Sequence, residues 1–308
     1  MNRMVDRRTV LRSCAGLLVA APFARFARAA DAPTLTKLGE KIALVTGCGG
    51  NVVALSTGEG LVLVDSGAHD RTRALLSQLR SLPGGNRVQT LFNTHCHEEH
   101  TGGNEVFGRA GAKIIAHEKT RLRLSTDVFV PTEDRYRKAR PKEAWPTESF
   151  YTQGELAVPG ERIEYGYLLQ AHTDGDAYVF FRDSNVLVVG DAVSPVRDPE
   201  FDWFAGGWIG GRIDSQALLL TLADENTKIV PGWGPVVTRA ELETERELMV
   251  RIYERMTELM RKGYTTDAMF EAGVVEGLGR TWQDPYRFVY AAHKGLWAHH
   301  NTISHDIV

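Results

Sequence analysis

The sequence predicts an α/β protein in which two β-sheets pack face to face and helices cover the outside. Apolar, strand-like segments alternate with helical ones, which is typical of layered α/β folds. The alternation occurs twice along the chain, and each run of strands ends in helices. Hydrophobic residues make up 43% and charged residues 24% of the 308 residues, a balance that suits a globular protein with a sizeable core.

The first run of elements covers residues 42–116. Short apolar segments separated by glycine-rich turns precede a pattern of leucines at helical spacing, which a Pro-Gly-Gly sequence stops. A buried strand, a short helix and another strand follow. The expected strands are 42–46, 52–56, 61–64, 88–92 and 113–116, and the expected helices are 70–82 and 104–109.

The second run follows an irregular, charged excursion at residues 122–154, which contains three prolines. The helix at 239–262 is the clearest in the chain because its apolar residues fall on one side. The expected strands are 163–169, 177–181, 186–189 and 228–230, and the expected helices are 215–222, 239–262, 266–272 and 286–297.

Residues 1–29 differ in character from the rest. Two adjacent arginines, Arg7 and Arg8, precede a mildly apolar stretch at 15–23, and an Ala-Arg-Ala sequence then offers a cleavage site. The paired arginines make this segment resemble a twin-arginine signal peptide. We therefore expect residues 30–308 to form an exported domain with C-terminal helices, periplasmic or secreted. The alternative is a basic, flexible N-terminus whose arginines are paired by chance.

Charge and cysteine content narrow the protein class. The formal net charge of −3 argues against a nucleic-acid surface, which would be basic. No further apolar run approaches the roughly 20 residues needed to span a bilayer, so we expect no stable membrane insertion after cleavage. Cys48 and Cys96 do not make a disulfide framework. Whether they pair stays open, as does the oligomeric state.

A cluster of histidines directly after the expected strand 88–92 is the strongest chemical signal. His95 and His97 are two residues apart, so they point to the same side of an extended chain. His100 follows where a helix is expected to begin. Imidazole is a common zinc ligand, and three of the ten histidines fall within six residues. The cluster predicts a metal site. The alternative is a surface loop that happens to hold three histidines.

Three other residues are weak signals by themselves. His172 and Asp191 each come after an expected strand, where a polar residue is ordinary. Asp65 ends the strand in Val-Leu-Val-Asp-Ser-Gly and is nearly as well explained as a turn former.

Together these pieces resemble the metallo-β-lactamase superfamily. The order fits the family's motifs: a strand ending at Asp65, an H-x-H-x-D-H-like block that begins at His95, a single histidine at His172, and a Gly-Asp after a strand at Asp191. The resemblance covers residues 36–240. It implies a four-layer αββα sandwich with the metals at one edge of the sheets.

The resemblance also implies a set of ligands. A first zinc ion would keep an open position for water, as in other three-histidine catalytic sites. Asp191 would bridge to a second metal, which His100 helps to hold. Asp65 would orient the ligands from behind. The ligands of the first zinc would be His95, His97 and His172.

Two residues depart from the family's pattern. Glu99 replaces the aspartate of H-x-H-x-D-H, and its longer stem ligates only if the backbone shifts. Trp233, in Pro-Gly-Trp-Gly, replaces a histidine, and an indole offers only an N–H donor. We therefore expect one zinc ion and a second site that is weak or empty. Zinc lowers the pKa of its bound water toward about 7. Asp191 and Glu99 are the expected catalytic residues, the first to orient that water and the second to take its proton.

An aromatic, glycine-rich segment at 201–211 follows Asp191. Trp203 and Trp208, together with Trp233, are candidates for binding a small apolar substrate, although a loop packed onto the core explains the segment equally well. The sequence thus favours an exported zinc hydrolase acting on an ester, thioester, lactone or amide bond of a small molecule. The alternative is a catalytically degenerate periplasmic protein that binds a metal or ligand on the same fold.

Overall fold

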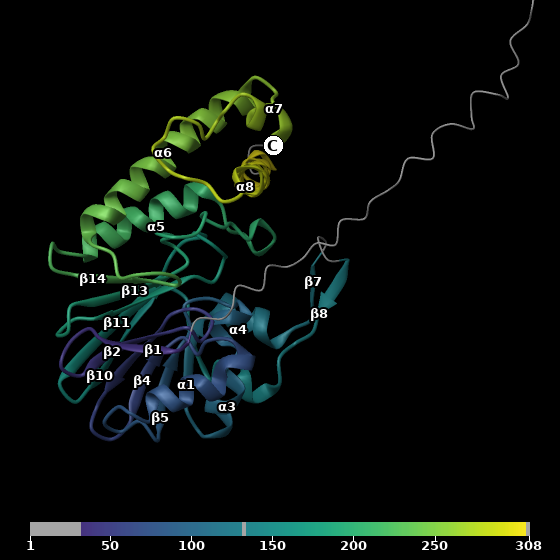
Figure 1. Cartoon of the computed structure of the whole chain (residues 1–308). Helices are drawn as coiled ribbons and strands as arrows, with labels where there is room; N and C mark the ends of the chain where they lie inside the picture. Colours follow the sequence, from purple (N-terminus) through teal and green to yellow (C-terminus); the bar gives the residue numbers. More distant parts are fainter. Residues whose placement is uncertain (1–31, 131–133, 306–308) are drawn as a thin grey trace, which may run out of the picture. The chain divides into compact units, whose positions relative to one another are not determined.

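Two β-sheets lie face to face at the centre of the molecule, in a computed structural model that describes residues 32–130 and 134–305 (Figure 1). Helices cover the outer face of each sheet, so the predicted αββα sandwich is confirmed. The expected export segment lies outside the described residues, and export stays a prediction.

The first sheet has seven strands and changes from antiparallel to parallel in its middle. Its first four strands follow one another through turns. The later pairs are parallel, which requires crossover connections, and α1 (Thr72–Leu79), α3 (Asn104–Arg109) and α4 (Glu118–Ser125) lie in these connections. The strand order is β1 (Thr34–Lys37), β2 (Ile42–Thr46), β3 (Val52–Ser56), β4 (Leu61–Val64), β5 (Val88–Phe92), β6 (Lys113–His117) and β9 (Glu148–Phe150).

The second sheet has five strands, of which the first four are antiparallel neighbours. Its last pair is parallel and is connected through α5 (Ile209–Leu222). Three helices follow: α6 (Arg239–Arg261), α7 (Thr266–Glu271) and α8 (Pro285–His305). The strand order is β10 (Gln153–Val158), β11 (Glu161–Tyr167), β12 (Ala177–Phe181), β13 (Val186–Gly190) and β14 (Lys228–Pro231).

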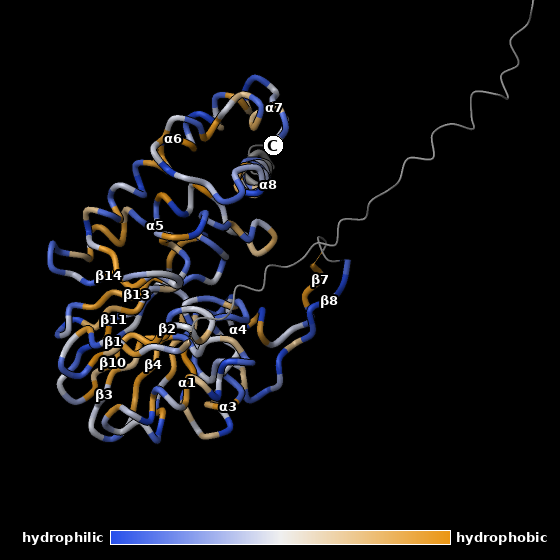
Figure 2. The backbone as a smooth tube through the Cα atoms, viewed as in Figure 1, coloured by the Kyte–Doolittle hydropathy of each residue, from blue (hydrophilic) through white to orange (hydrophobic). Residues whose placement is uncertain are grey.

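The main core lies between the two sheets. Val62 and Phe92 from the first sheet pack in one cluster with Phe181 and Val188 from the second. Strands β3 and β4 are buried on both faces because α1 covers the outer side, and apart from Ser56 at the end of β3 they are accordingly apolar (Figure 2). This core fixes the two sheets against each other, so residues at their shared edge are held in place.

The C-terminal helices form a second apolar cluster on the outer side of the second sheet. α5, α6, α7 and α8 contribute Ile213, Ile252, Met269 and Phe288 to it. The predicted helix 239–262 is confirmed as α6. It begins with a capping box in which Thr238 and Glu241 satisfy each other's backbone N–H groups.

Several expected elements differ in extent, among them the helix expected at 286–297, which is Pro285–His305 as α8, and the strand expected at 163–169, which is Glu161–Tyr167 as β11. The helix expected at 70–82 covers only Thr72–Leu79, after a short 3₁₀ turn. α5 starts at Ile209, six residues before the expected 215, because Gly211 allows the helix to contact the Gln170 carbonyl, where a Cβ atom would lie only 2.4 Å away. The excursion is less irregular than expected, since it contains α4 and a hairpin, β7 (Val128–Val130) and β8 (Arg135–Arg137).

Two other expectations can be compared with the described residues. No helix in this part of the chain has both the length and the apolar character that a bilayer span requires. Cys48 and Cys96 are both free thiols, so the pairing left open by the sequence is not formed.

Candidate metal centre

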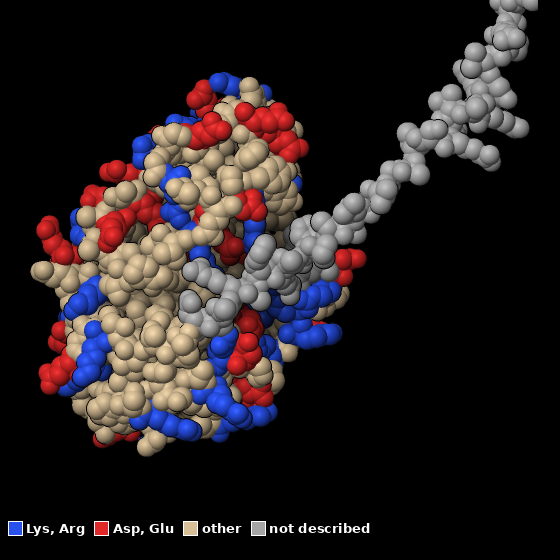
Figure 3. All heavy atoms as spheres, viewed as in Figure 1, with Lys and Arg blue, Asp and Glu red and all other residues tan. Residues whose placement is uncertain are grey.

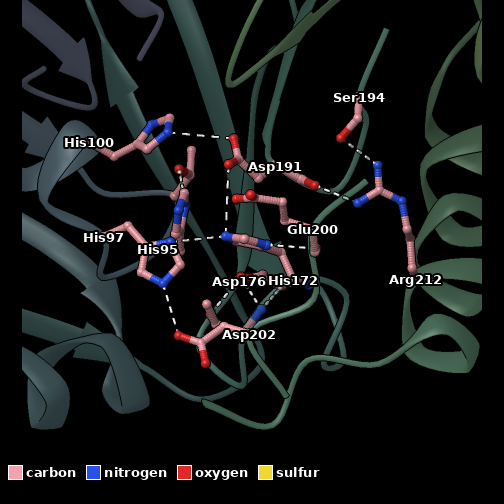
Figure 4. A network of polar contacts seen from close by, with 12 residues as sticks. His95, His97, His100, His172, Asp176, Asp191, Ser194, Glu200, Asp202 and Arg212 are labelled. Carbon is pink, nitrogen blue, oxygen red and sulfur yellow. Dashed lines mark hydrogen bonds and ion pairs between the residues drawn. The ribbon is translucent and has the colours of Figure 1, made fainter. Parts of the chain in front are cut away.

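The expected site residues meet at one edge of the sandwich, beyond the carboxyl ends of four strands. Asp65 follows β4 and His95 follows β5, while Asp191 follows β13 and Trp233 follows β14. β4 and β5 are parallel neighbours, and so are β13 and β14, so each pair ends on the same side. His172 joins them from the connection between β11 and β12 (Figure 4). Open α/β sheets commonly bind ligands at such strand ends.

His95, His97 and His172 form a first metal group. One ligand atom from each lies within 4.8 Å of the others. The Nδ1 atom of His97 and the Nε2 atom of His172 are 3.0 Å apart, and the ring centroids of His95 and His172 are separated by 4.8 Å. The structure therefore brings together three imidazoles that are up to 77 positions apart in the printed sequence.

Each imidazole of this first group is oriented through its other ring nitrogen. A partner on the outer nitrogen fixes the ring and its tautomer, as is usual for histidines that bind metals. The three contacts are His95 Nδ1 with Thr94 Oγ1 (3.1 Å), His97 Nε2 with Asp202 Oδ2 (3.0 Å) and His172 Nδ1 with the Glu200 carbonyl (2.9 Å).

The inner nitrogen of His95 fits a cation. His95 Nε2 is buried and has no hydrogen-bond partner among the described residues, a costly state unless a ligand completes it. Burial, and then the charges of His100, His172 and His97, hold the pKa of His95 well below its usual value. A neutral imidazole with an available lone pair is what a divalent metal requires.

A second metal group consists of His95, His100 and Asp191. His100 Nε2 and Asp191 Oδ1 lie 3.5 Å apart, and neither has a hydrogen-bond partner within the described part of the chain. The other oxygen of Asp191 is 3.7 Å from His172 Nε2, so this carboxylate stands between the two groups.

The charges around His100 differ from those around His95. Burial acts to lower the pKa of His100, but the carboxylates of Asp191 and Asp65 outweigh it and raise that pKa to about 9. Burial acts to raise the pKa of Asp191, and the positive charges of His100 and His172 lower it instead. Without a second metal, a protonated His100 therefore offsets one of the two negative charges of Asp191 and Asp65.

Asp65 supports both groups from behind. Its carboxylate accepts hydrogen bonds from the backbone N–H and the hydroxyl of Thr94, both at 2.8 Å, and contacts His100 Nδ1 at 2.8 Å. Thr94 in turn contacts His95. The backbone of Asp65 has φ of 63°, a left-handed conformation that aspartate tolerates better than most residues. Through these contacts Asp65 would hold Thr94 and His100 in place, and its orienting role stays a prediction.

Trp233 lies against the second group, where the sequence placed it. Its ring meets His100 edge to face with centroids 5.8 Å apart, and the guanidinium of Arg197 lies 3.4 Å from the Trp233 ring centroid. The backbone of Gly232 also lies against the second group, because a Cβ atom on Gly232 would be only 1.9 Å from Asp191 Oδ1. Indole and backbone therefore occupy the side of the second group that a further ligand would need.

Glu99 belongs to neither group of ligand atoms. It is half-buried and lines a cleft of about 500 Å³ that also exposes His97. The charge of Glu99 acts on both His97 and His100, so its carboxylate lies near the two groups without joining them.

The predicted aromatic residues are arranged differently from expectation. Phe204 lines the cleft, whereas Trp203 and Trp208 do not. Trp203 packs on Phe204 with ring centroids 4.4 Å apart. Trp208 stacks on His299 of α8 at 3.6 Å and packs against the C-terminal helix cluster. Since α5 begins at the next residue, the indole of Trp208 is directed toward the helices and away from the cleft.

Two important residues were missed from the sequence. Asp202, which holds His97, has a pKa lowered to about 2: burial acts to raise it, and the hydrogen bond and charge of His97 prevail. Arg212 is fully buried in α5 and donates to the Asp191 carbonyl (2.6 Å), Ser194 Oγ (2.9 Å) and Glu245 (2.6 Å). The sequence does hold a signal for Arg212. Glu245 lies on the apolar side of α6 with Leu242, and a carboxylate buried there needs a cationic partner.

Comparisons with known proteins agree with this geometry. The family profile described as the metallo-beta-lactamase superfamily matches residues 45–233. The 2,4-dinitroanisole O-demethylase subunit alpha of a Nocardioides species is 26% identical over 227 residues, which span 70% of this chain and 62% of that protein. This chain therefore covers less than two thirds of that relative.

Solved structures show the same fold. A metallo-beta-lactamase from Pontibacter korlensis has a TM-score of 0.56 and 21% identity, over 70% of this chain and 98% of the other. A stereoselective inverting sec-alkylsulfatase from a Pseudomonas species has a TM-score of 0.62 and 16% identity, over 87% of this chain and 50% of the other.

Proposed function

This chain belongs to the metallo-β-lactamase superfamily, and from that premise we propose that it is an exported hydrolase with one zinc ion. It would cleave an ester, thioester, lactone or amide bond in a small organic molecule. The observation that carries the proposal is the first metal group, in which the buried His95 Nε2 lacks a partner beside His97 and His172. The proposal of export rests on residues 1–29 alone.

The residues of the site have distinct tasks. His95, His97 and His172 would hold the zinc ion, which when bound supplies Lewis acidity and a nucleophilic water near neutral pH. Glu99, which lines the cleft beside His97, would act as the general base through its carboxylate. Asp191 stands between the two metal groups and would orient the water by accepting a hydrogen bond.

One metal ion is favoured over two. The second group reaches three ligand atoms only by sharing His95 with the first group, so its own ligands are His100 and Asp191. Trp233 and Gly232 fill its remaining side, and a protonated His100 already offsets part of the negative charge of Asp191 and Asp65.

A binding protein without turnover is the second candidate function. Trp233 favours it, because the tryptophan removes a side chain that two-metal relatives in this superfamily use as a ligand. Turnover of any substrate by the zinc-loaded protein separates the two candidates.

The test combines elemental analysis with a substrate panel. Purified protein should contain about one zinc per chain, and the panel should include ester, thioester, lactone and β-lactam bonds. The name of the Nocardioides relative adds an aryl methyl ether to it. Because deleting a partner of a ligand already costs 10- to 100-fold in affinity, we expect His95→Ala to lower zinc affinity by more than about 100-fold and to abolish turnover.

The matched control is His69→Ala, which removes an exposed histidine outside both metal groups. Zinc content and turnover should match the unchanged protein. If His95→Ala retains its zinc, the first group is not the metal site. If the protein retains zinc but turns over nothing in the panel, the binding candidate replaces the hydrolase.

A further inference from the structure

A short 3₁₀ turn, η5 (Trp203–Ala205), is built directly onto the metal centre. One carboxylate oxygen of Asp202 accepts a hydrogen bond from the Ala205 N–H at 3.0 Å, and the other contacts His97 Nε2 at 3.0 Å (Figure 4). The backbone N–H of Asp202 donates to the His172 carbonyl at 2.9 Å. Two residues of the first metal group therefore hold the start of this turn.

The end of the turn is held as closely as its start. Gly206 ends it with φ of 82°, a left-handed conformation that glycine adopts without strain. A Cβ atom on Gly207 would lie only 1.9 Å from the carbonyl oxygen of His172. The Asp174 N–H donates to the Ala205 carbonyl at 2.6 Å. The backbone of the turn thus has a fixed position relative to the first metal group.

Phe204 is the residue that this turn presents to the cleft beside the metal groups. Its side chain is 41% exposed, and Trp203 packs on it with ring centroids 4.4 Å apart. A single exposed apolar residue is ordinary on a protein surface. Phe204 differs because its turn is held by candidate metal ligands, and because the cleft volume of about 500 Å³ falls within the roughly 300 to 1,000 Å³ typical of ligand pockets. Phe204 therefore offers an aromatic surface to a ligand beside the metal centre.

Charged residues of both signs line the same cleft. Figure 3 shows Lys and Arg atoms next to Asp and Glu atoms where Figure 1 draws the β7–β8 hairpin. Several of these charges are paired within the protein. Arg123 bonds Asp174 through two nitrogens at 2.7 and 2.8 Å, and Lys138 bonds Asp127 at 2.7 Å. Because such pairs offset their own charges, contact with the apolar part of the lining is a source of affinity that remains for a ligand.

The apolar part of the lining contains a second phenylalanine. Phe129 is 42% exposed and packs on Tyr136, its partner across the hairpin, with ring centroids 5.2 Å apart. The hairpin thus sets the position of Phe129, whereas residues of the first metal group hold the turn that carries Phe204. Phe204 is therefore the better placed of the two to orient a ligand toward the metal. The apolar residues of the lining are Leu124, Val128, Phe129, Val130, Phe204 and Ala205.

We propose that the substrate carries an aromatic ring and that Phe204 binds this ring, which makes Phe204 a residue that determines specificity. Two aromatic rings packed edge to face or offset gain stability beyond the area that they bury. Phe204 should therefore select an aromatic ring over a saturated ring of the same size. With the aromatic ring on Phe204, the bond to be cleaved lies beside His97. This inference rests on the proposed hydrolase function.

The test measures binding, so that it does not depend on turnover. The probes are 4-phenyl-1-butanol and 4-cyclohexyl-1-butanol, which are uncharged and differ only in the ring. The saturated ring is the more hydrophobic of the two, so burial alone would favour the cyclohexyl probe. Ligand-observed NMR titrations are carried out on the full chain, both zinc-loaded and metal-stripped. We expect the phenyl probe to bind at least about threefold more tightly in both states, which corresponds to the extra stability of one aromatic pair.

The variant that tests the aromatic contact is Phe204→Leu, which keeps an apolar side chain and removes the ring. The ratio of the two affinities should then fall to about one or below. The matched control is Phe270→Leu, because Phe270 is 36% exposed, packs on Tyr286 and lies in α7 outside the cleft lining. Zinc content and far-UV circular dichroism should be unchanged in both variants, since both rings are exposed and neither residue belongs to a metal group.

Each alternative result has a definite meaning. If the unchanged protein shows no preference for the phenyl probe, or if Phe204→Leu keeps that preference, Phe204 does not bind the ring and the inference is wrong. The inference is also wrong if stripping the metal or the substitution Phe270→Leu abolishes the preference. If the preference depends on Phe204 but the zinc-loaded protein cleaves nothing, the hydrolase proposal fails and the aromatic site stands as a binding site.

Discussion

The two metal groups share His95 and lie at the same edge of the sandwich, yet they differ in what surrounds them. The first group opens onto the cleft through His97, and the outer nitrogen of each of its rings has a partner. The second group is closed by Trp233 and Gly232. The comparison teaches that two groups with the same number of ligand atoms can differ in how open they are. We expect Trp233, just beyond β14, to limit access to the second group.

The largest effect on activity should come from substituting Glu99, a change that distinguishes metal ligation from proton transfer. Because Glu99 joins neither group, Glu99→Gln should leave zinc content unchanged and lower kcat by about 100-fold or more, the typical contribution of a general base. The measurement is steady-state kinetics together with elemental analysis. Glu98→Gln is the control, since Glu98 lines the same cleft but bonds the backbone N–H of His69. A parallel loss of zinc would make Glu99 a ligand.

A smaller effect should come from Asp202, which contacts His97 of the first group and no residue of the second. Asp202→Asn removes the charge that fixes His97, so zinc affinity should fall about 10- to 100-fold, as for other partners of ligating histidines. Competition with a chromophoric chelator measures it. Asp174→Asn is the control, because Asp174 lies in the same region but bonds Arg123 and no histidine. Equal affinities in the two variants would show that Asp202 does not support the metal.

The smallest effect should come from opening the second group. Trp233→His replaces an indole that cannot ligate with an imidazole that can, so metal content should rise from about one to about two ions per chain in excess zinc. The control is Trp282→His, a partly buried tryptophan in the C-terminal helix cluster. If both variants bind one ion, Trp233 does not limit the second group, and the comparison above needs another cause.

Much of the fold was predictable from local pattern. The predicted bounds of β5 and α3 agree with the observed ones. Polar or glycine residues flank both the apolar run of β5 and the short helix α3 and so mark their ends. The first metal group could be predicted in part, because His95 and His97 directly follow a strand. His172 and Asp191 could be predicted as site residues only from their order in the family motif, since their local sequence does not distinguish them from ordinary turn residues.

The missed features depend on contacts between distant parts of the chain. Trp208 was expected at the cleft because it is near Asp191 in sequence, but the start of α5 directs it toward α8. Asp202 lies in the same segment, and only the folded chain shows it beside His97. The cations that line the cleft lie in the segment that the sequence predicts to be an irregular charged excursion, because the sequence does not show that α4 and the β7–β8 hairpin fold beside His97.

The buried pair of Arg212 and Glu245 connects the C-terminal helices to the candidate metal centre. Arg212 holds the main chain of Asp191, and Glu245 on α6 holds Arg212. Breaking such a pair costs about 3 to 5 kcal/mol, since it leaves a lone charge out of water. Loss or replacement of α5 or α6 should therefore be tolerated less well than loss of a peripheral extension. Damage to this pair would reach Asp191, whose carboxylate stands between the two metal groups.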